Sequence, residues 1–383
     1  MILLRVTLFF LLLLLLPDWY IYRYYLKPAG HKSWNRLLWV PTLILLAALV
    51  VFIIGGESLH NYLGIYLVTV ICISIPKAFF SLLSLPVRFI RKRFTSSPLE
   101  VPFLCIPCVL LFAYLLFGAI KGKEHFQVRE VTFSSPDLPT AFDGYRILQI
   151  SDLHTGSWKG NKKALQTAIN LCNAQKADLA VFTGDLVNSR ASEMEEFMPV
   201  LSQLQAKDGV YSVLGNHDYA TYVHWNSEAE RLANIDTLIV RQKQMGWHLL
   251  LNEHVNLYRG NDSIALVGVE NSGNPPFPDK GDLPKALKGT SGMFKVLLSH
   301  DPTHWRRNVL PQTDIQLMLA GHTHDMQFNI LGFSASQFFY PEHNGMYLEK
   351  KRGLYVNIGL GYVLFPMRLG AWPEITVITL HKI

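Results

Sequence analysis

The first part of the chain contains four long apolar stretches separated by short polar segments. Each stretch is close to the roughly 20 residues that a helix needs to cross the hydrocarbon core of a bilayer. The pattern predicts four membrane-spanning helices, at residues 2–22, 37–54, 63–85 and 101–120. Lys77 is the one charged residue well inside a predicted span. We expect it to face the helix bundle or to extend toward the interface, and the spans to anchor the chain.

The first stretch also has the leucine-rich core of a cleaved signal peptide. No small-x-small cleavage site follows it. The stretch ends instead in Pro17, Asp18, Trp19 and Tyr20, which is typical of a span end with interfacial aromatic residues. We therefore expect the mature protein to retain this stretch as a span.

Positive charge is unevenly distributed among the loops between the spans. The loops after the first and third spans are basic, with Arg23, Lys27, Lys32 and Arg36 in one and Arg88, Arg91, Lys92 and Arg93 in the other. The intervening loop has Glu57 and no Lys or Arg. The positive-inside rule then places the basic loops in the cytoplasm and everything after the fourth span on the outer side, the periplasm of a Gram-negative cell. Arg5, Lys121 and Lys123 oppose this orientation weakly.

From about residue 121 the apolar runs become short and alternate with polar segments of helical periodicity. Strands are predicted at 146–152, 178–185, 210–214, 264–269, 294–299, 315–320, 354–358 and 375–380, and helices at 161–176 and 193–204. Strands that first alternate with helices and then follow one another indicate an α/β domain with a central sheet. We therefore expect a transmembrane region at 1–121 and a soluble domain at 122–383.

Charge and cysteine content separate the same two parts. Residues 1–121 contain 11 Lys and Arg but 3 Asp and Glu, whereas residues 122–383 contain 24 and 26. The soluble part has no basic stripe, so we expect no nucleic acid among its partners. Its one cysteine, Cys172, excludes an internal disulfide framework, and the Cys105-x-x-Cys108 pair lies in an apolar run where packing is the expected role.

Polar side chains that suit metal coordination follow five of the predicted strands. They are Asp152 and His154, then Asp185, then Asn216 with His217 and Asp218, then His300, and finally His322 and His324. A single fragment of this kind is commonly a helix cap or a turn. In an α/β sheet, however, ligands bind at the carboxyl ends of the strands. Together these residues predict a metal site with mixed carboxylate, imidazole and amide ligands, a set that suits Mn²⁺, Fe or Zn²⁺.

The series resembles the calcineurin-like metallophosphoesterase superfamily, whose pattern is D-x-H, G-D, G-N-H-[DE], a separate His, and G-H-x-H. Every element occurs in order over roughly residues 145–325. The resemblance implies a central β-sandwich flanked by helices, here preceded by four transmembrane helices, and two divalent metal ions. One ion would be bound by Asp152, His154, Asp185 and His324, and the other by Asp185, Asn216, His300 and His322.

The resemblance also implies a mechanism, in which a hydroxide that bridges the two ions attacks the phosphorus atom. Asp185 would be the bridging carboxylate. His217 would contact the substrate and protonate the leaving group, and Asp218 would orient its imidazole.

The C-terminal part carries a second, narrower resemblance. Residues 354–361, 366–369 and 373–375 resemble the signature of a bacterial subgroup of membrane-associated or exported phosphohydrolases, which we take to indicate the bacterial inner membrane. Some members are UDP-2,3-diacylglucosamine pyrophosphatases of lipid A synthesis. The subgroup commonly has two glycines where Asp325 and Met326 stand here, so its substrate is not carried over. Arg368 is a candidate for a phosphate contact or for a structural ion pair.

The leading prediction is a membrane-anchored phosphohydrolase that cleaves a phosphomonoester, phosphodiester or pyrophosphate bond in a small-molecule or lipid-linked substrate. A lipid A pyrophosphatase is an alternative, and it would need a cytosolic UDP-linked substrate. A non-enzymatic membrane scaffold with the same fold is another, although such proteins usually lose ligands or the proton donor. The aromatic residues between 328 and 347 are expected either to pack in the core or to form a rim that holds an acyl chain or a base.

Overall fold

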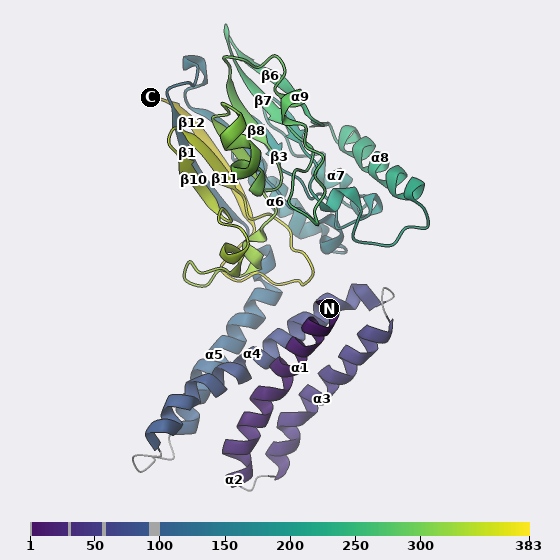
Figure 1. Ribbon diagram of the computed structural model, residues 1–383, viewed down its shortest axis with the longest axis vertical. Coiled ribbons are helices and arrows are strands. Elements are labelled where there is room, and N and C mark those ends of the chain that lie inside the picture. Colours follow the sequence, from purple (N-terminus) through teal and green to yellow (C-terminus); the bar gives the residue numbers. More distant parts are fainter. Residues whose placement is uncertain (1, 30–31, 56–58, 92–99) are drawn as a thin grey trace. The chain divides into compact units, whose positions relative to one another are not determined.

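The computed structural model describes residues 2–29, 32–55, 59–91 and 100–383 (Figure 1). The chain divides into two compact units. One comprises Met1–Gly122 with Leu364–Met367 and is called the helical unit below; the other comprises Lys123–Val363 with Arg368–Ile383 and is called the sheet unit. Three residues used above to predict orientation, Glu57, Lys92 and Arg93, lie outside the described residues.

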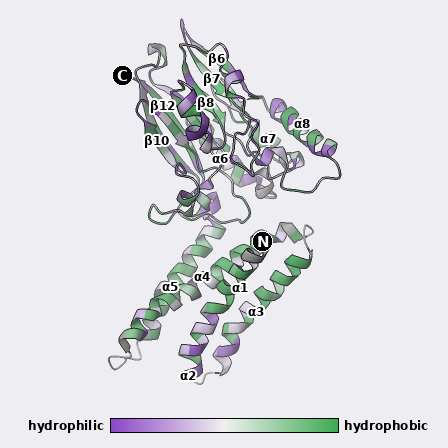
Figure 2. Ribbon diagram, in the orientation of Figure 1, coloured by the Kyte–Doolittle hydropathy of each residue, from purple (hydrophilic) through white to green (hydrophobic). Residues whose placement is uncertain are grey.

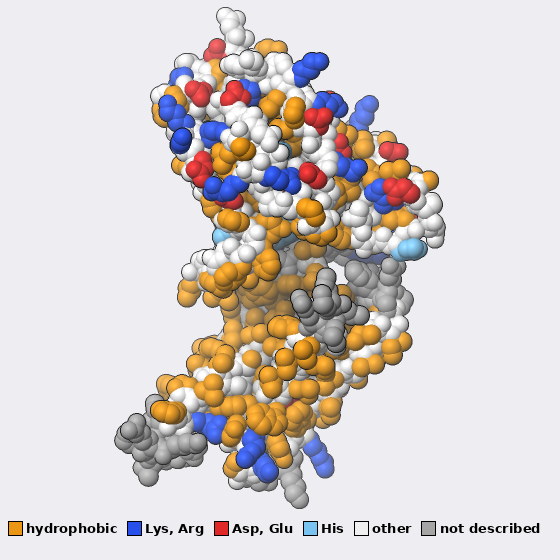
Figure 3. Space-filling view, viewed as in Figure 1, with side chains coloured by type: hydrophobic (Ala, Val, Ile, Leu, Met, Phe, Trp, Pro, Cys, Tyr) orange, Lys and Arg blue, Asp and Glu red, His pale blue; other side chains and the backbone are white. Residues whose placement is uncertain are grey.

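The helical unit confirms the four predicted spans. Its long helices are α1 (Ile2–Ile21), α3 (Lys32–Gly55), α4 (His60–Arg91) and α5 (Glu100–Ile120). Each is long and apolar enough to cross a membrane, and Figure 2 shows their predominantly hydrophobic residues. In Figure 3, hydrophobic side chains cover the visible face of this unit, and Lys and Arg gather at the end that carries α2 (Lys27–Ala29).

Asp18 lies within a span rather than at its end, because α1 continues into a π-helical turn at Tyr22–Leu26. Lys77 of α4 faces this residue, with its Nζ 2.8 Å from Oδ1 of Asp18. The same ammonium donates to Oγ1 of Thr42 and to the Leu38 carbonyl oxygen of α3, each over 3.2 Å. Asp18 is fully buried and also accepts from the Thr42 hydroxyl. One buried polar cluster thus joins α1, α3 and α4, and Lys77 faces the bundle.

The sheet unit is built from two six-stranded sheets. The first has the order β1 (Gln127–Ser135), β12 (Glu374–Lys382), β2 (Tyr145–Ile150), β3 (Leu179–Phe182), β4 (Val210–Ser212), β5 (Trp247–Leu249). The second has the order β10 (Gly345–Glu349), β11 (Arg352–Val356), β9 (Leu317–Ala320), β8 (Phe294–Leu298), β7 (Asp262–Gly268), β6 (Glu253–Arg259). All eight predicted strands are present, and β1, β5, β6 and β10 are additional.

Alternating side chains of the strands enter different cores, as the period of two requires. Ile147 of β2 and Val296 of β8 lie in the core between the sheets, whereas the next residues, Leu148 and Leu297, lie in cores on the outer faces. Helix α6 (Lys162–Ala174) and helix α8 (Glu228–Gln244) cover the first sheet, and α9 (Leu283–Ala286) lies against the second. The expected α/β sandwich with flanking helices is confirmed.

The helix predicted at 193–204 is broken into two short segments. A 3₁₀ turn spans Ala191–Met194, and helix α7 spans only Met198–Leu201. Pro199 stands in the first turn of α7, where its missing N–H costs nothing. The same missing donor prevents one continuous helix through this point.

Candidate metal centre

The strands of both sheets deliver the predicted side chains to one place. Parallel strands β2, β3 and β4 end just before Asp152, Asp185 and Asn216, while β8 and β9 of the other sheet end just before His300 and His322. All seven candidate ligands are almost entirely excluded from solvent. His154 and His324, which are 170 positions apart in the chain, thereby become neighbours.

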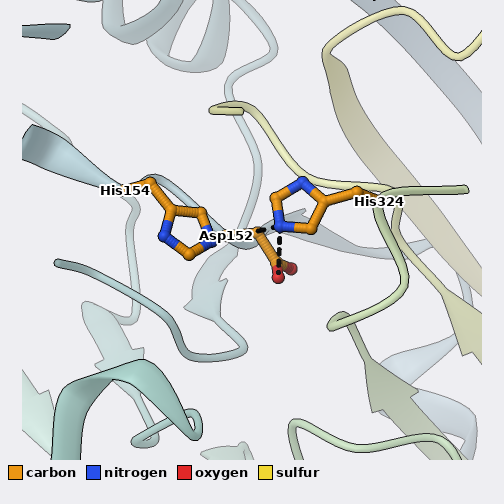
Figure 4. Close-up of side chains that lie close together, drawn as sticks. All are labelled: Asp152, His154 and His324. Carbon is orange, nitrogen blue, oxygen red and sulfur yellow. Dashed lines mark hydrogen bonds and ion pairs between the residues drawn. The ribbon is translucent and has the colours of Figure 1, made fainter. Parts of the chain in front are cut away.

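A first group consists of Asp152, His154 and His324, whose possible ligand atoms all lie within 4.8 Å of one another. Nε2 of His324 is 3.1 Å from Nε2 of His154 and 3.3 Å from Oδ1 of Asp152. Figure 4 shows the ring of His324 joined to both residues by dashed lines. Three donor atoms therefore converge on one small space.

A second group consists of Asn216, His300 and His322. Nδ1 of His322 lies 2.8 Å from Oδ1 of Asn216 and 3.3 Å from Nε2 of His300, and the last two atoms are 3.1 Å apart. Asp185 adjoins both groups, because its Oδ2 is 3.2 Å from Nε2 of His300 and 3.7 Å from Nε2 of His154. Its position fits a carboxylate shared by two ions.

These spacings are those of ligands around a cation. Two donor atoms that each lie about 2.1 Å from one ion are roughly 3.0–3.4 Å apart when the angle between them is right or tetrahedral. Five of the separations within the two groups are 2.8 to 3.3 Å, and all donor atoms of the first group lie within 4.8 Å of one another. The residues present thus fit a pair of divalent ions.

Neighbouring polar groups orient several of the candidate ligands. Nδ1 of His300 lies 2.8 Å from the Thr183 carbonyl oxygen, which can only accept, so the neutral ring that would bind a metal turns the lone pair of Nε2 toward the site. Asn216 donates its amide to the hydroxyl of Tyr222 over 2.7 Å, which leaves its oxygen toward the histidines. Nε2 of His322 lies 2.8 Å from the hydroxyl of Tyr340, and this contact leaves Nδ1 of the same ring facing the site.

The backbone at the site is strained. Five of the seven candidate ligands have left-handed φ values: Asp152 at 50°, His154 at 48°, Asp185 at 62°, His322 at 77° and His324 at 49°. This conformation costs a residue with a Cβ roughly 1–2 kcal/mol. Such strain concentrates at functional sites, where it is offset by the surrounding structure.

Gly215 and Gly321 have no side chain, and the carboxylates of Asp185 and Asp152 occupy the space where a Cβ would lie. A Cβ on Gly215 would lie 2.2 Å from Oδ1 of Asp185, and a Cβ on Gly321 would lie 2.0 Å from Oγ of Ser151 and 2.3 Å from Oδ2 of Asp152. Any other residue would push the candidate ligands apart, which is why the close approach of these loops requires glycine.

The electrostatics of the centre favour positive charge. Burial alone would raise the pKa of Asp185, but the imidazoles of His300 and His217 hold it well below its usual value. Burial alone would lower the pKa of His300, but the Asp185 carboxylate raises it to about 10. The buried carboxylate thus draws a compensating cation, a role that a metal ion fulfils.

His217 and Asp218 occupy different roles in the structure. Nδ1 of His217 is 2.8 Å from the Asn188 carbonyl oxygen, and its ring stacks on Tyr222 with centroids 4.2 Å apart. Asp218 instead accepts backbone N–H groups from Asp185, Leu186, Val187 and Gly215. The residue that orients His217 here is Asn188, which sequence reasoning did not identify, and Asp218 holds two of the site's loops together.

The sandwich and its strand-end Asp, His and Asn side chains define a metallophosphoesterase. Residues 145–326 match the family described as "Calcineurin-like phosphoesterase", and residues 4–123 match "Probable Calcineurin-like phosphoesterase, transmembrane domain". A "Transmembrane protein with metallophosphoesterase domain" from Danio rerio is 31% identical over 279 residues, which cover 70% of this chain and 60% of that one. The "Uncharacterized metallophosphoesterase YkuE" of Bacillus subtilis (strain 168) is 30% identical over 70% of this chain and 88% of its own.

The chain therefore belongs to the calcineurin-like phosphoesterase family, and it is a membrane protein. It spans about three fifths of the length of the vertebrate relatives it matches. Among solved structures, the phosphopantetheinyl hydrolase PptH of Mycobacterium tuberculosis is similar at 16% identity and a TM-score of 0.37, over 58% of this chain and 91% of that one. Similarity at that level carries no argument about function.

Proposed function

We propose that this protein is a membrane-anchored phosphohydrolase with two divalent metal ions, which cleaves a phosphomonoester, phosphodiester or pyrophosphate bond. One observation carries the proposal: two groups of buried donor atoms have metal-ligand spacing and adjoin the same carboxylate, that of Asp185. Asp152, His154 and His324 with Asp185 would hold one ion. Asn216, His300 and His322 with Asp185 would hold the other.

The donor set supports Mn, Fe or Zn, because imidazole nitrogen suits these metals better than Ca²⁺ or Mg²⁺. When bound, such ions supply Lewis acidity, activate water as a nucleophile near neutral pH and neutralise charge on phosphoryl oxygens. The left-handed backbone at five of the ligands and the short loops after the strands preorganise the donors for this task.

His217 is the residue we propose to protonate the leaving group. Nδ1 faces the Asn188 carbonyl oxygen and therefore keeps its own proton, so the proton given to the leaving group would be a second one carried on Nε2 of the imidazolium, which then becomes the neutral ring. Stacking on Tyr222 fixes the ring plane, and the backbone N–H of His217 donates to Oδ1 of Asp185 over 2.8 Å. Asp218 acts as a positioning residue through its hydrogen bonds to the loops after β3 and β4.

We propose that residues 1–121 anchor the protein in the bacterial inner membrane and that residues 122–383, on the periplasmic side, catalyse the reaction. The charge difference between the loops supports this orientation. Alkaline phosphatase fused to the C-terminus would be active if this is right. Activity of a cytoplasmic reporter at the same place would reverse the orientation and favour a cytosolic nucleotide-linked substrate, such as that of a lipid A pyrophosphatase.

The catalytic proposal is tested with purified full-length protein, Mn²⁺ and a panel of p-nitrophenyl phosphate monoesters and diesters. Asp185→Asn should lower hydrolysis by roughly 100-fold or more, since even groups that only orient metal ligands cost about 10–100-fold when removed. Asp236→Asn, an exposed carboxylate of α8, is the matched control and should retain wild-type activity. Failure of the wild type on every ester, or full activity of Asp185→Asn, would overturn the proposal.

A further inference from the structure

An uncharged apolar loop lies beside the candidate metal centre. Residues 326–341, between β9 and β10, contain no Asp, Glu, Lys, Arg or His. Five of their large hydrophobic side chains are exposed, from 51% of Ile330 to the whole of Leu331, with Phe333, Phe338 and Phe339 between them. Figure 3 shows hydrophobic side chains gathered where Figure 1 draws this segment. The three phenylalanines are therefore not packed in the core, which was one of the two roles expected from the sequence.

The exposed tip has a defined conformation. Ile330 and Phe333 exchange both backbone hydrogen bonds, at 2.9 and 3.0 Å, around Leu331 and Gly332 at positive φ. This tight reversal projects Leu331 outward. The rings of Phe333 and Phe338 meet edge to face with centroids 5.9 Å apart, which joins the reversal to the following 3₁₀ turn (Ala335–Phe338).

A buried carboxylate anchors the base of the loop. Asp325 is fully buried and accepts hydrogen bonds from Asn329, Ser336 and Asn344 over 2.6, 2.8 and 2.9 Å. Its neighbour in the chain is the candidate ligand His324. At the other end of the loop, the hydroxyl of Tyr340 lies 2.8 Å from Nε2 of His322. Both ends of the apolar loop are therefore attached directly to candidate ligands.

From these observations we propose that loop 326–341 inserts its apolar tip into the bilayer surface and brings the metal centre to phosphate groups of membrane lipids. Two observations favour a lipid surface as the partner of this loop. Exposed Phe, Leu and Ile without any charge are disfavoured in water but suit the boundary between headgroups and acyl chains. In addition, residues 121–126 alone connect α5 to β1, so the sheet unit is tethered close to a bilayer. The substrate class that follows, a lipid-linked phosphate, rests on the proposed function.

Membrane contact is tested by photocrosslinking of the full-length protein in phosphatidylcholine vesicles that contain a radiolabelled phospholipid. p-Benzoylphenylalanine replaces Leu331 or Phe338 in turn, and Tyr258 of β6, 69% exposed, is the control position in the same unit. The two loop positions should acquire lipid label several-fold above the control. Equal labelling at all three positions, or crosslinks from the loop to this chain's own helices or to a second copy in place of lipid, would overturn the proposal.

Substrate delivery is tested with two esters that share a leaving group, p-nitrophenyl hexadecyl phosphate in vesicles and p-nitrophenyl methyl phosphate in solution. The double variant Leu331→Glu, Phe338→Glu should hydrolyse the vesicle ester several-fold more slowly and the soluble ester at the wild-type rate. If the double variant and the wild type hydrolysed the vesicle ester at equal rates, substrate delivery by the loop would be overturned. If the wild type cleaves neither of these esters nor any ester of the p-nitrophenyl panel, the proposed function fails, and crosslinking alone decides the membrane contact.

Discussion

Nη2 of Arg368 lies 3.0 Å from Nδ1 of His324, deep inside the sheet unit. The guanidinium donates to the carbonyl oxygens of Gly361, Ala371 and Ile358. It is fully buried, and no ion pair joins it to a carboxylate among the described residues, so the structural ion pair considered from the sequence is not its role. Arg368 instead ties the C-terminal loop to a candidate ligand and fixes the plane of that imidazole.

Arg368→Lys should destabilise the sheet unit by about 2–4 kcal/mol, because one ammonium cannot reach all three carbonyl oxygens and leaves buried acceptors unpaired. The thermal unfolding midpoint of the full-length protein in nanodiscs measures the effect. Arg306→Lys is the matched control, since Arg306 is mostly exposed and its ion pairs with Glu342 and Glu349 contribute little. Equal midpoints for the two variants would contradict this role of Arg368.

Removal of divalent ions should lower the unfolding midpoint of the wild-type protein. Ions that bind the folded state alone stabilise it by about 3–4 kcal/mol when present at 100 to 1,000 times their dissociation constant. Unfolding scans before and after dialysis against a chelator, with elemental analysis, check this and identify the metals. Asp185→Asn, which lacks the shared carboxylate, should respond less, and an equal response would place the ions elsewhere.

The strand ends could be predicted from the sequence because each ligand follows a short apolar run of a buried strand. Burial on both faces makes such runs nearly continuous, as in β3, whose four residues are all buried. Helix α8 escaped prediction because its surface is largely polar, with only Leu238 and Gln242 buried along 17 residues. Strand β5 escaped prediction because only one of its three residues is buried, whereas the equally short β4 runs on into the buried Val213 and Leu214.

Contacts between distant segments could not be read from the sequence. Asn188 orients His217 through a backbone carbonyl, a group that every residue has. Asp325 and Met326 replace glycines at φ values of 49° and 47°, and only the folded structure shows that the Asp325 side chain anchors a loop there. Asp18 resembled a span end because proline and aromatic residues surround it. Membrane helices tolerate proline, however, and this one continues.

Lys77→Met should destabilise the helical unit by about 3–5 kcal/mol, because it leaves Asp18 buried without its cation. The double variant Asp18→Asn, Lys77→Met should recover much of this loss, since the remaining amide still accepts from the Thr42 hydroxyl. Resistance of the reconstituted protein to unfolding in SDS measures both variants. Additive losses in the double variant would show that the two residues act independently.

His304 is a buried residue whose Nδ1 lies 2.9 Å from Oγ of Ser299. Burial, helped by the charge of Arg307, lowers the pKa of His304 from 6.5 to about 4. The folded state therefore binds this proton less readily than the unfolded state. The contribution of neutral His304 to the free energy of unfolding is complete above pH 6.5 and is lost as pH falls toward 4. The shift corresponds to about 3 kcal/mol.

His304→Asn keeps a polar atom near Ser299 but cannot titrate. It should be less stable than the wild type at pH 7, and the difference should shrink as pH falls from 6.5 to 4. Unfolding midpoints across this range measure the difference, and comparison within each pH cancels the titration of the other histidines. His248→Asn, at an exposed position in β5, should follow the wild type throughout. A constant gap between His304→Asn and the wild type would mean that His304 binds its proton equally well in the folded and unfolded states, which its burial beside Arg307 opposes.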